Sequence, residues 1–313
     1  MLMSAGLGTR MLPFTEDCPK ALTPLLGVPI AQFAWDQLEE AWVRNVVVNL
    51  HHLAEVARAG FQALDLRKVG IEFSDERHEI LGSAGGIAHA LPRLRNGPFF
   101  LMNADVLQDV DLRGLARAHA QSGAKLTLAL TRLPDARESY REIQVNSDGR
   151  ITGYGEKKRG ALFYTGVGIL DPSLVEPISP ERPSDFVREI LDPAIRRGEA
   201  YAVEHSGLWM DLGSPELWAQ AHFDLMHALE SGSVPERIRA RVDRVSMRVR
   251  DGFWVSRNFS RVPTGAFEQV YLGNGFYRGS GARRSVWYGN SSCRTHEPER
   301  SWIAHGRHIQ ALS

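Results

Sequence analysis

The sequence predicts an α/β protein with a mixed, mainly parallel sheet and a small C-terminal β domain. Three observations support this prediction. Up to about residue 140, apolar runs typical of buried strands alternate with segments of helical periodicity. From there to about residue 231, a hairpin signal interrupts the alternation and two further helices follow. Beyond about residue 232, short β-like runs recur without a helical period.

Strand and helix signals alternate through the first part of the chain. We expect strands at residues 2–5, 46–50, 70–74, 98–103 and 125–130, and helices at residues 30–43, 53–64, 86–94 and 112–122. Strands that alternate with helices form mainly parallel sheets with helices on both faces. This region is therefore predicted to be Rossmann-like. The chain begins only three residues before Ser4, so either its first strand is short or the sequence starts late.

The segment that follows combines a hairpin, a strand and two helices. Asn146–Gly149 separates two short β runs, and its Asp-Gly pair favours a β-hairpin. We expect a further strand at residues 163–170 and helices at residues 184–195 and 215–229, with Ser184 and Ser214 as the N-caps.

The C-terminal region has β-like runs separated by Gly and small polar residues. Phe253–Val255, Gln269–Gly275 and Ser285–Gly289 recur at intervals of roughly 16 to 18 residues, about one coil of a hexapeptide-repeat β-helix. The repeats are degenerate, so a small irregular β subdomain is the alternative. We therefore predict an α/β domain at residues 1–231 and a β-helix-like domain at residues 232–313.

Composition and charge argue against several classes of protein. The 313 residues carry 37 Lys plus Arg and 37 Asp plus Glu, so the basic surface of a nucleic-acid binder is not expected. Cys18 and Cys293 lie far apart in no metal-ligand spacing, which argues against a disulfide framework. We expect no signal peptide, because the run Met1–Ser4 is too short and lacks a basic lead, and no apolar run approaches about 18 residues. We therefore expect no membrane partner and a cytoplasmic location.

The strongest local signal is the glycine-rich segment Ser4–Thr15. Glycine lets the backbone adopt positive φ, and a turn after a strand presents N–H groups that can cradle phosphate. Arg10 adds a planar cationic donor, and Lys20 follows between two prolines. A dinucleotide-binding fingerprint would need a third Gly at Met11, and a P-loop would end in Gly-Lys-Ser/Thr. A plain structural turn is the remaining alternative.

Residues 6–30 form a compound motif: Gly6-Leu7-Gly8-Thr9-Arg10, Pro13, Thr15, Pro19-Lys20-Ala21-Leu22, Pro24-Leu25, Gly27 and Pro29-Ile30. This motif resembles the signature of the sugar-1-phosphate nucleotidylyltransferases, and is closest in look to the mannose- and heptose-1-phosphate guanylyltransferases. The resemblance implies that a nucleoside triphosphate and a sugar-1-phosphate react to give a nucleotide sugar and pyrophosphate. It also implies that Arg10 and Lys20 are catalytic. The nucleotide-binding residues would be Ala5, Gly6, Gly8, Thr9, Ser83, Ala84 and Gly85, the last three in a small-residue loop before a helix.

Two aspartates match the metal-binding positions of this family. Asp105 follows an expected strand, at the end where open α/β sheets bind ligands. Asp211 lies in Trp209-Met210-Asp211-Leu212-Gly213-Ser214-Pro215, which resembles the family segment Trp-x-Asp-x-Gly-Thr-Pro with Ser for Thr. Mg²⁺ prefers carboxylate oxygens and often takes only one or two from the protein. The resemblance therefore implies Mg²⁺ as cofactor, and a turn residue is the alternative reading of each aspartate.

A third set of residues resembles the sugar-phosphate pocket of the family. Gly155-Glu156-Lys157 resembles a Glu-Lys-Pro element, with Lys158 in place of Pro, and Tyr164-Thr165-Gly166 resembles its Thr-Gly pair. The implied sugar-phosphate residues are Asn103, Glu156, Lys157, Thr165 and Gly166. A solvated charge cluster and an ordinary strand are the alternatives.

These residues do not determine the base of the nucleoside triphosphate or the sugar of the sugar-1-phosphate. The Leu81–Gly85 loop resembles the guanylyltransferases, whereas the context of Asn103–Asp105 also resembles uridylyltransferases of cell-wall recycling. Several members of the family carry a left-handed β-helix after the catalytic domain, which fits the tail and favours GTP. A homo-oligomer is a hypothesis, because β-helices often mediate self-association. A non-catalytic nucleotide-sugar sensor and a glycosyltransferase are the rivals.

Overall fold

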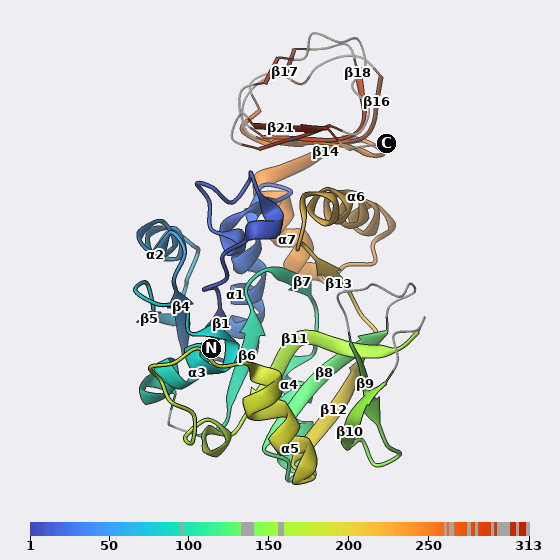
Figure 1. Cartoon of the computed structure of the whole chain (residues 1–313). Helices are drawn as coiled ribbons and strands as arrows, with labels where there is room; N and C mark the ends of the chain where they lie inside the picture. The colour runs from blue at the N-terminus through green and yellow to red at the C-terminus, as the bar shows by residue number, and fades with distance from the viewer. Residues whose placement is uncertain are drawn as a thin grey trace. The chain divides into compact units, whose positions relative to one another are not determined.

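The computed structural model describes residues 1–94, 97–132, 141–155, 160–259, 262, 266–273, 277–278, 281–288, 291–292, 301–304 and 307–310 (Figure 1). The chain divides into two compact units, each made from two segments. The first unit contains Met1–Leu7 and Gln37–Trp209, and the second contains Gly8–Asp36 and Met210–Ser313. Helix α1 (Ile30–Glu40) contains one of the boundaries between them.

The first unit is built around a mixed sheet. Its strands are β1 (Leu2–Met3), β4 (Asn45–Leu50), β5 (Gly70–Asp75), β6 (Phe99–Asn103), β8 (Leu126–Arg132), β11 (Leu162–Leu170) and β12 (Ala200–His205). Their order is β12-β8-β11-β6-β1-β4-β5. Strand β11 is antiparallel to β6 and β8, and the other neighbours pair in parallel. The predicted mixed, mainly parallel sheet is therefore confirmed, and β12 is a strand that the sequence analysis missed.

Helices pack against this sheet. They are α2 (Ala54–Gln62), α3 (Gly82–Ala90), α4 (Leu112–Ser122) and α5 (Asp192–Arg196), the last entered through a π-helical turn at Val187–Leu191. Helix α4 has the bounds expected from the sequence. The Asp111 carboxylate accepts the Gly114 N–H at 2.9 Å, and Gly123 ends the helix in the left-handed conformation. These are the usual N-cap and C-terminal stop signals of a helix.

The structure tests the predicted β-hairpin and the predicted N-cap at Ser184. Strands β9 (Glu142–Val145) and β10 (Ile151–Gly155) are antiparallel, as the Asp-Gly signal predicted. The prediction that Ser184 is the N-cap was wrong. The Asp185 carboxylate accepts the backbone N–H groups of residues 187 and 188, while the Ser184 hydroxyl donates to the Arg182 carbonyl.

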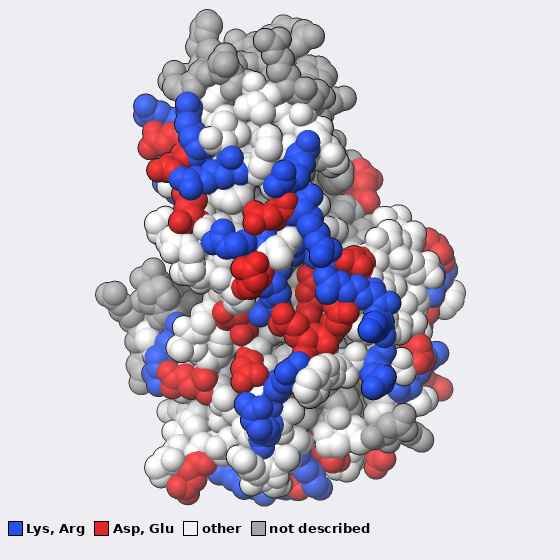
Figure 2. Space-filling model, turned by 180° about the vertical axis from the view of Figure 1, so that it is seen from behind, with Lys and Arg blue, Asp and Glu red and all other residues white. Residues whose placement is uncertain are grey.

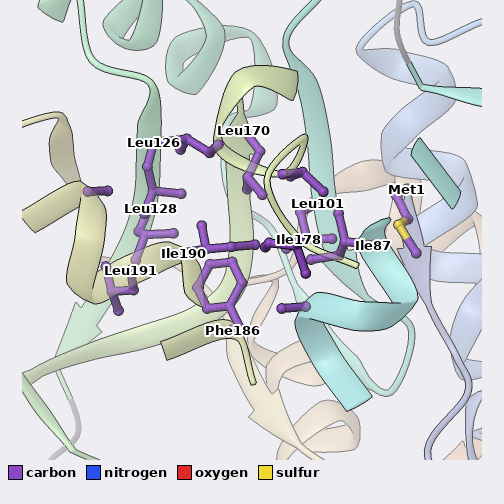
Figure 3. Close-up of a cluster of buried hydrophobic side chains, with 14 of the residues drawn as sticks. Met1, Ile87, Leu101, Leu126, Leu128, Leu170, Ile178, Phe186, Ile190 and Leu191 are labelled. Atoms are coloured by element: carbon purple, nitrogen blue, oxygen red, sulfur yellow. The ribbon is translucent and has the colours of Figure 1, made fainter. Parts of the chain in front are cut away.

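The hydrophobic core of the first unit lies between the sheet and its helices. Leu126 and Leu128 project from β8 toward Leu101 of β6 and Ile190 near α5 (Figure 3). Ile87 of α3 and Phe186, which precedes the π-helical turn, complete the contact between the helices and the strands. Burial of each such side chain contributes about 1.5–3 kcal/mol, so this cluster fixes the strands whose ends carry the site.

The second unit begins at Gly8, within the compound motif, and continues with helices and strands. It contains the 3₁₀ turns Thr9–Met11 and Lys20–Leu22, the short hairpin β2 (Pro24–Leu25) and β3 (Val28–Pro29), α6 (Pro215–Ser231) and α7 (Glu236–Val245). Ser214 caps α6 as predicted, because its hydroxyl accepts the Leu217 N–H at 3.3 Å. Helix α7 corrects the expectation of a region without helix. Its ten residues include four Arg, one Glu and one Asp, and these charged residues obscured the buried pair Ile238 and Val242.

The strands after α7 form the C-terminal β region. Strands β15 (Phe253–Ser256), β16 (Ala266–Leu272), β18 (Gly281–Trp287) and β20 (Ser301–Ala304) pair in parallel. Val255 pairs with Leu272, Leu272 with Trp287, and Trp287 with Ile303. Strands β14 (Ser246–Arg250) and β21 (Arg307–Gln310) flank this stack in antiparallel orientation.

The remaining short strands of the described residues are β7 (Val106–Gln108), β13 (Trp209–Asp211), β17 (Tyr277–Arg278) and β19 (Ser291–Ser292).

Charge and hydropathy of the folded chain add two observations. On the face drawn in Figure 2, Lys and Arg side chains are interspersed with Asp and Glu among the coloured residues. No helix in the described part of the chain is long and apolar enough to cross a membrane.

Candidate active site

A cavity of about 280 Å³ lies in the first unit, at the carboxyl ends of its parallel strands. Met3 is the last residue of β1, and Ala5 and Gly6 follow it. Asn49 lies near the end of β4, Glu76 follows β5, Asn103 is the last residue of β6, and Asp105 follows that strand. Ile80, Gly82 and Ser83 complete its lining at the start of α3. Open α/β sheets bind ligands at this edge. The structure therefore brings Ala5, Gly6, Ser83, Asn103 and Asp105 from the sequence prediction into one cavity.

Two polar residues of this cavity were missed by the sequence analysis. The Ser4 N–H donates to Asn49 Oδ1 at 2.7 Å, and Asn49 Nδ2 donates to Glu76 Oε1 at 2.6 Å. The Leu81 N–H donates to Glu76 Oε2 at 3.1 Å. Asn49 and Glu76 thus connect the glycine-rich turn to the start of α3. Asn49 is polar within the otherwise apolar run of residues 46–50, and that signal could have identified it.

Glu76 is a buried carboxyl group. Burial raises its pKa, and the donors from Asn49 and Leu81 only partly oppose this effect. A Cβ atom at Gly86 would lie 2.9 Å from Glu76 Oε1. Glycine at position 86 therefore lets α3 approach this carboxylate closely.

The glycine-rich start of α3 packs against the segment at residues 182–186. A Cβ at Gly82, whose φ is +69°, would lie 2.7 Å from the Ser184 carbonyl oxygen, and a Cβ at Gly85 would lie 2.7 Å from that of Arg182. Ser83 Oγ accepts the Phe186 N–H at 2.8 Å, which leaves its own proton for another acceptor.

The bounds of α3 correct the expectation of a loop at residues 81–85 followed by a helix at residues 86–94. The helix begins at Gly82, because the Ser184 carbonyl accepts the Ala84 N–H at 2.9 Å and the preceding Leu81 N–H is held by Glu76. Ala84 and Gly85 are buried in this turn, and among the described residues only Gly82 and Ser83 of it line the cavity.

Asn103 and Gly166 lie together, whereas the Thr165 side chain serves the sheet. A Cβ at Gly166, whose φ is +87°, would lie 2.9 Å from Asn103 Nδ2. The Thr165 hydroxyl is buried and donates to the Ala129 carbonyl at 2.8 Å. The Trp209 indole N–H donates to the Thr165 carbonyl at 3.0 Å. Thr165 therefore shapes the strand next to Asn103 with its hydroxyl already engaged.

The other predicted residues that the structure describes lie in the second unit. Gly8 has a φ of +66°, and its carbonyl accepts the Thr15 hydroxyl at 2.8 Å. Gly8 and Thr15 therefore set the direction in which Thr9 and Arg10 leave the turn. Lys20 begins a 3₁₀ turn, and its carbonyl accepts the Thr23 hydroxyl at 2.7 Å.

Arg10 and Asp211 meet beside Gly213 in the second unit. A Cβ at Gly213 would lie 3.0 Å from Asp211 Oδ1 and 3.3 Å from an Arg10 guanidinium nitrogen. Glycine here leaves room for the carboxylate and the guanidinium at the same backbone position.

Glu156 and Lys157 lie outside the described residues. Within the described ranges, no group of three or more His, Cys, Asp or Glu could hold a metal ion.

A mainly parallel α/β sheet with a cavity at its strand ends, lined by glycine-rich turns, defines an α/β protein with a ligand-binding site at that edge. Residues 1–227 match the family described as nucleotidyl transferase. The chain therefore belongs to the nucleotidyl transferase family. The resemblance to its sugar-1-phosphate nucleotidylyltransferases is confirmed, and the chain is a nucleotidyltransferase.

Curated relatives and solved structures agree with this family. Mannose-1-phosphate guanylyltransferase catalytic subunit beta of Danio rerio is 28% identical over 246 residues, 77% of this chain and 68% of the relative. N-acetylmuramate alpha-1-phosphate uridylyltransferase of Caulobacter vibrioides is 31% identical over 236 residues, 73% and 97% of the two chains. HddC from Yersinia pseudotuberculosis, also solved with GMP-PN, shares the fold with a TM-score of 0.62 and 21% identity over 72% of this chain and 97% of HddC.

Proposed function

We propose that this enzyme transfers a nucleotidyl group from a nucleoside triphosphate, with GTP favoured, to a sugar-1-phosphate, giving a nucleotide sugar and pyrophosphate. The observation that carries this proposal is the cavity at the carboxyl ends of the parallel strands. It unites Gly6 and Ser83, proposed to bind nucleotide, with Asn103 and Asp105, proposed to bind sugar phosphate and metal.

The nucleoside is proposed to lie against the glycine-rich turn and the start of α3. A Cβ at Gly6 would have no atom within 4 Å among the described residues, so the backbone there is open to a flat ligand. Ser83 keeps a hydroxyl proton, because its oxygen accepts from Phe186. Ala5 and Gly6 would contact the base and ribose, and Ala84 and Gly85 would act by shaping the turn.

The phosphates are proposed to lie along Gly8, Thr9 and Arg10. Arg10 is exposed, and its guanidinium presents several donors in a fixed plane suited to phosphate oxygens. In our proposal Arg10 stabilises the departing pyrophosphate, while Lys20 neutralises charge near the α-phosphate. Asn103, Glu156, Lys157, Thr165 and Gly166 are proposed to hold the sugar phosphate, with Thr165 acting through the strand.

Mg²⁺ is the proposed cofactor, held by Asp105 and Asp211. The oxygen donors fit such a hard cation, since Asp105 shares the cavity lining with the amide of Asn103, and Mg²⁺ commonly takes few protein ligands. When bound, the ion would neutralise charge on the phosphate oxygens.

The reaction requires positioning more than proton transfer. A phosphate oxygen of the sugar-1-phosphate attacks the α-phosphorus, the bond from that phosphorus to its bridging oxygen breaks, and pyrophosphate leaves. The attacking oxygen is already ionised, so no general base is required. Fixed donors such as Arg10 and Lys20 would then lower the barrier by binding charge where it develops.

Uridylyl transfer is the second candidate function. The uridylyltransferase relative is matched over 97% of its length, whereas the guanylyltransferase relative is matched over 68%. We favour GTP because the Leu81–Gly85 sequence resembles the guanylyltransferases and because of the C-terminal strands. We also propose a left-handed β-helix in a domain at residues 232–313, supported by the parallel pairing of β15, β16, β18 and β20.

The test is pyrophosphate release with Mg²⁺, using GTP, UTP, ATP, CTP and dTTP against a panel of sugar-1-phosphates. Release that depends on one nucleotide and one sugar phosphate supports the proposal and fixes its specificity. Asp105→Asn and Lys20→Ala should each reduce turnover by about 10²–10³-fold, the loss typical of one preorganised contact. Asp148→Asn, in the exposed hairpin turn, is the matched control and should retain activity. Near-normal turnover in either site variant would contradict the proposed function.

A further inference from the structure

The turn between β2 and β3, which follows Lys20 in the sequence, has a constrained backbone. Pro24 pairs with Pro29 and Leu25 with Val28, so residues 26 and 27 form the two-residue turn between β2 and β3. Leu26 has a φ of +46° and Gly27 a φ of +82°. The left-handed conformation is unfavourable for leucine, so the surroundings of this turn must hold it in place.

The peptide group between Leu26 and Gly27 is held at both ends by the C-terminal region. Ser246 Oγ donates to the Leu26 carbonyl at 2.8 Å, so its oxygen accepts from the Tyr271 hydroxyl at 2.9 Å. The Gly27 N–H donates to the Tyr288 hydroxyl oxygen at 3.0 Å. A Cβ at position 27 would lie 2.9 Å from the Tyr271 hydroxyl oxygen, so glycine is also required by space.

A second chain of hydrogen bonds returns from Tyr288 to the same hairpin. The Tyr288 hydroxyl donates to His222 Nε2 at 3.0 Å, and His222 Nδ1 donates to the Trp218 carbonyl at 2.9 Å. The Trp218 indole N–H donates to the Pro24 carbonyl at 2.8 Å. Burial lowers the pKa of His222 to about 3, which keeps the ring neutral and Nε2 an acceptor.

Lys20 is linked to this turn through two hydrogen bonds, one from a side chain and one within the backbone. The Thr23 hydroxyl donates to the Lys20 carbonyl at 2.7 Å, and the Ile30 N–H donates to the Thr23 carbonyl at 3.1 Å. We infer that Tyr271 and Tyr288 are positioning residues, which hold the β2–β3 turn and thereby the Lys20 segment in its working conformation. The kinetic part of this inference rests on the proposed function of Lys20.

The experiment compares the full-length variants Tyr288→Phe and Tyr271→Phe with the full-length wild type. Each substitution removes a hydroxyl and keeps the ring. Hydrogen exchange of the Gly27 amide in Tyr288→Phe should accelerate about tenfold or more, because a buried donor loses its acceptor. With the nucleotide and sugar phosphate that the wild type uses, kcat should fall roughly tenfold at nearly constant KM, the pattern of a contact made only in the transition state.

Trp254→Phe is the matched control. The Trp254 indole N–H donates to Glu230 Oε1 at 2.8 Å, so this variant also loses a bond between the C-terminal strands and α6, but one that does not involve residues 26 and 27. It should leave Gly27 exchange and kcat unchanged. The inference is overturned by unchanged Gly27 exchange in Tyr288→Phe, by fast exchange with normal kcat, or by an equal effect in Trp254→Phe. If the wild type shows no turnover, the proposed function fails, and unchanged Gly27 exchange alone still overturns the inference that Tyr288 holds the β2–β3 turn.

Discussion

At the scale of single residues, Asn49 and Glu76 organise the cavity. Asn49 uses both ends of its amide, accepting from Ser4 and donating to Glu76. Glu76 accepts at both oxygens, from Asn49 and from Leu81. A buried carboxylate is tolerated when such donors satisfy it, and the result is a rigid connection between two turns.

The raised pKa of Glu76 predicts a pH-dependent stability. The folded state binds this proton more tightly than the unfolded state, whose carboxyl has a pKa of 4.5. The contribution of Glu76 to stability is therefore complete below pH 4.5 and is lost as the pH rises through the folded-state pKa. We expect the free energy of unfolding of the wild type to fall over this window relative to Glu76→Gln. Denaturant titrations at a series of pH values measure this.

Glu72→Gln provides the control for that series, because Glu72 is an exposed carboxyl on β5. Its stability curve should run parallel to that of the wild type. Parallel curves for Glu76→Gln and the wild type would contradict the prediction.

At the scale of elements, the start of α3 depends on glycine for packing. Positions 82 and 85 contact carbonyl oxygens of residues 184 and 182, and position 86 contacts Glu76. Gly82, which lines the cavity, thus also lets the helix approach a second segment of the chain.

Gly85→Ala tests this packing through the sign of its effect. In an open helix, replacing glycine by alanine stabilises by about 1 kcal/mol. Here the new Cβ would lie 2.7 Å from the Arg182 carbonyl oxygen, so the backbone would have to move. We expect a loss of about 1–3 kcal/mol, the range for overpacking, seen as a lower Tm in thermal unfolding. A higher Tm would mean that the segments are not in contact.

At the scale of the whole molecule, each compact unit is assembled from two distant parts of the chain. In the second unit, Arg241 of α7 forms a bidentate ion pair with Asp36 of α1, at 2.6 and 2.7 Å. Both side chains are more than nine-tenths buried, and Gln32 also donates to the Asp36 carboxylate. This pair fastens the region after residue 231 to the segment that carries the compound motif.

Arg241→Met should destabilise the protein by about 3–5 kcal/mol, because it leaves the Asp36 charge buried without its partner. The double variant Arg241→Met/Asp36→Leu should recover a large part of that loss, since a buried ion pair contributes little net stability over apolar packing. Chemical denaturation of the two single variants and the double variant closes the cycle. Strictly additive losses would contradict a direct coupling.

The sequence by itself determined the family, the α/β class and most strands and helices of the first unit. The compound motif around Arg10 and Lys20, the Ser214 cap and the Asp-Gly hairpin are local signals, since they depend on residues a few positions apart. Periodicity failed for α7, where charged residues alternate with few apolar ones, and for β12, which has no strong apolar run.

Only the tertiary structure decided which residues meet. Asn49 and Glu76 are 27 positions apart, and Gly27 and Tyr288 are 261 apart. No local pattern encodes such contacts, because the sheet order and the return of the chain into the second unit create them. The start of α3 was misplaced for the same reason: carbonyl and carboxylate acceptors from other segments hold its first turn. Local chemistry sets the elements, and long-range packing sets the site.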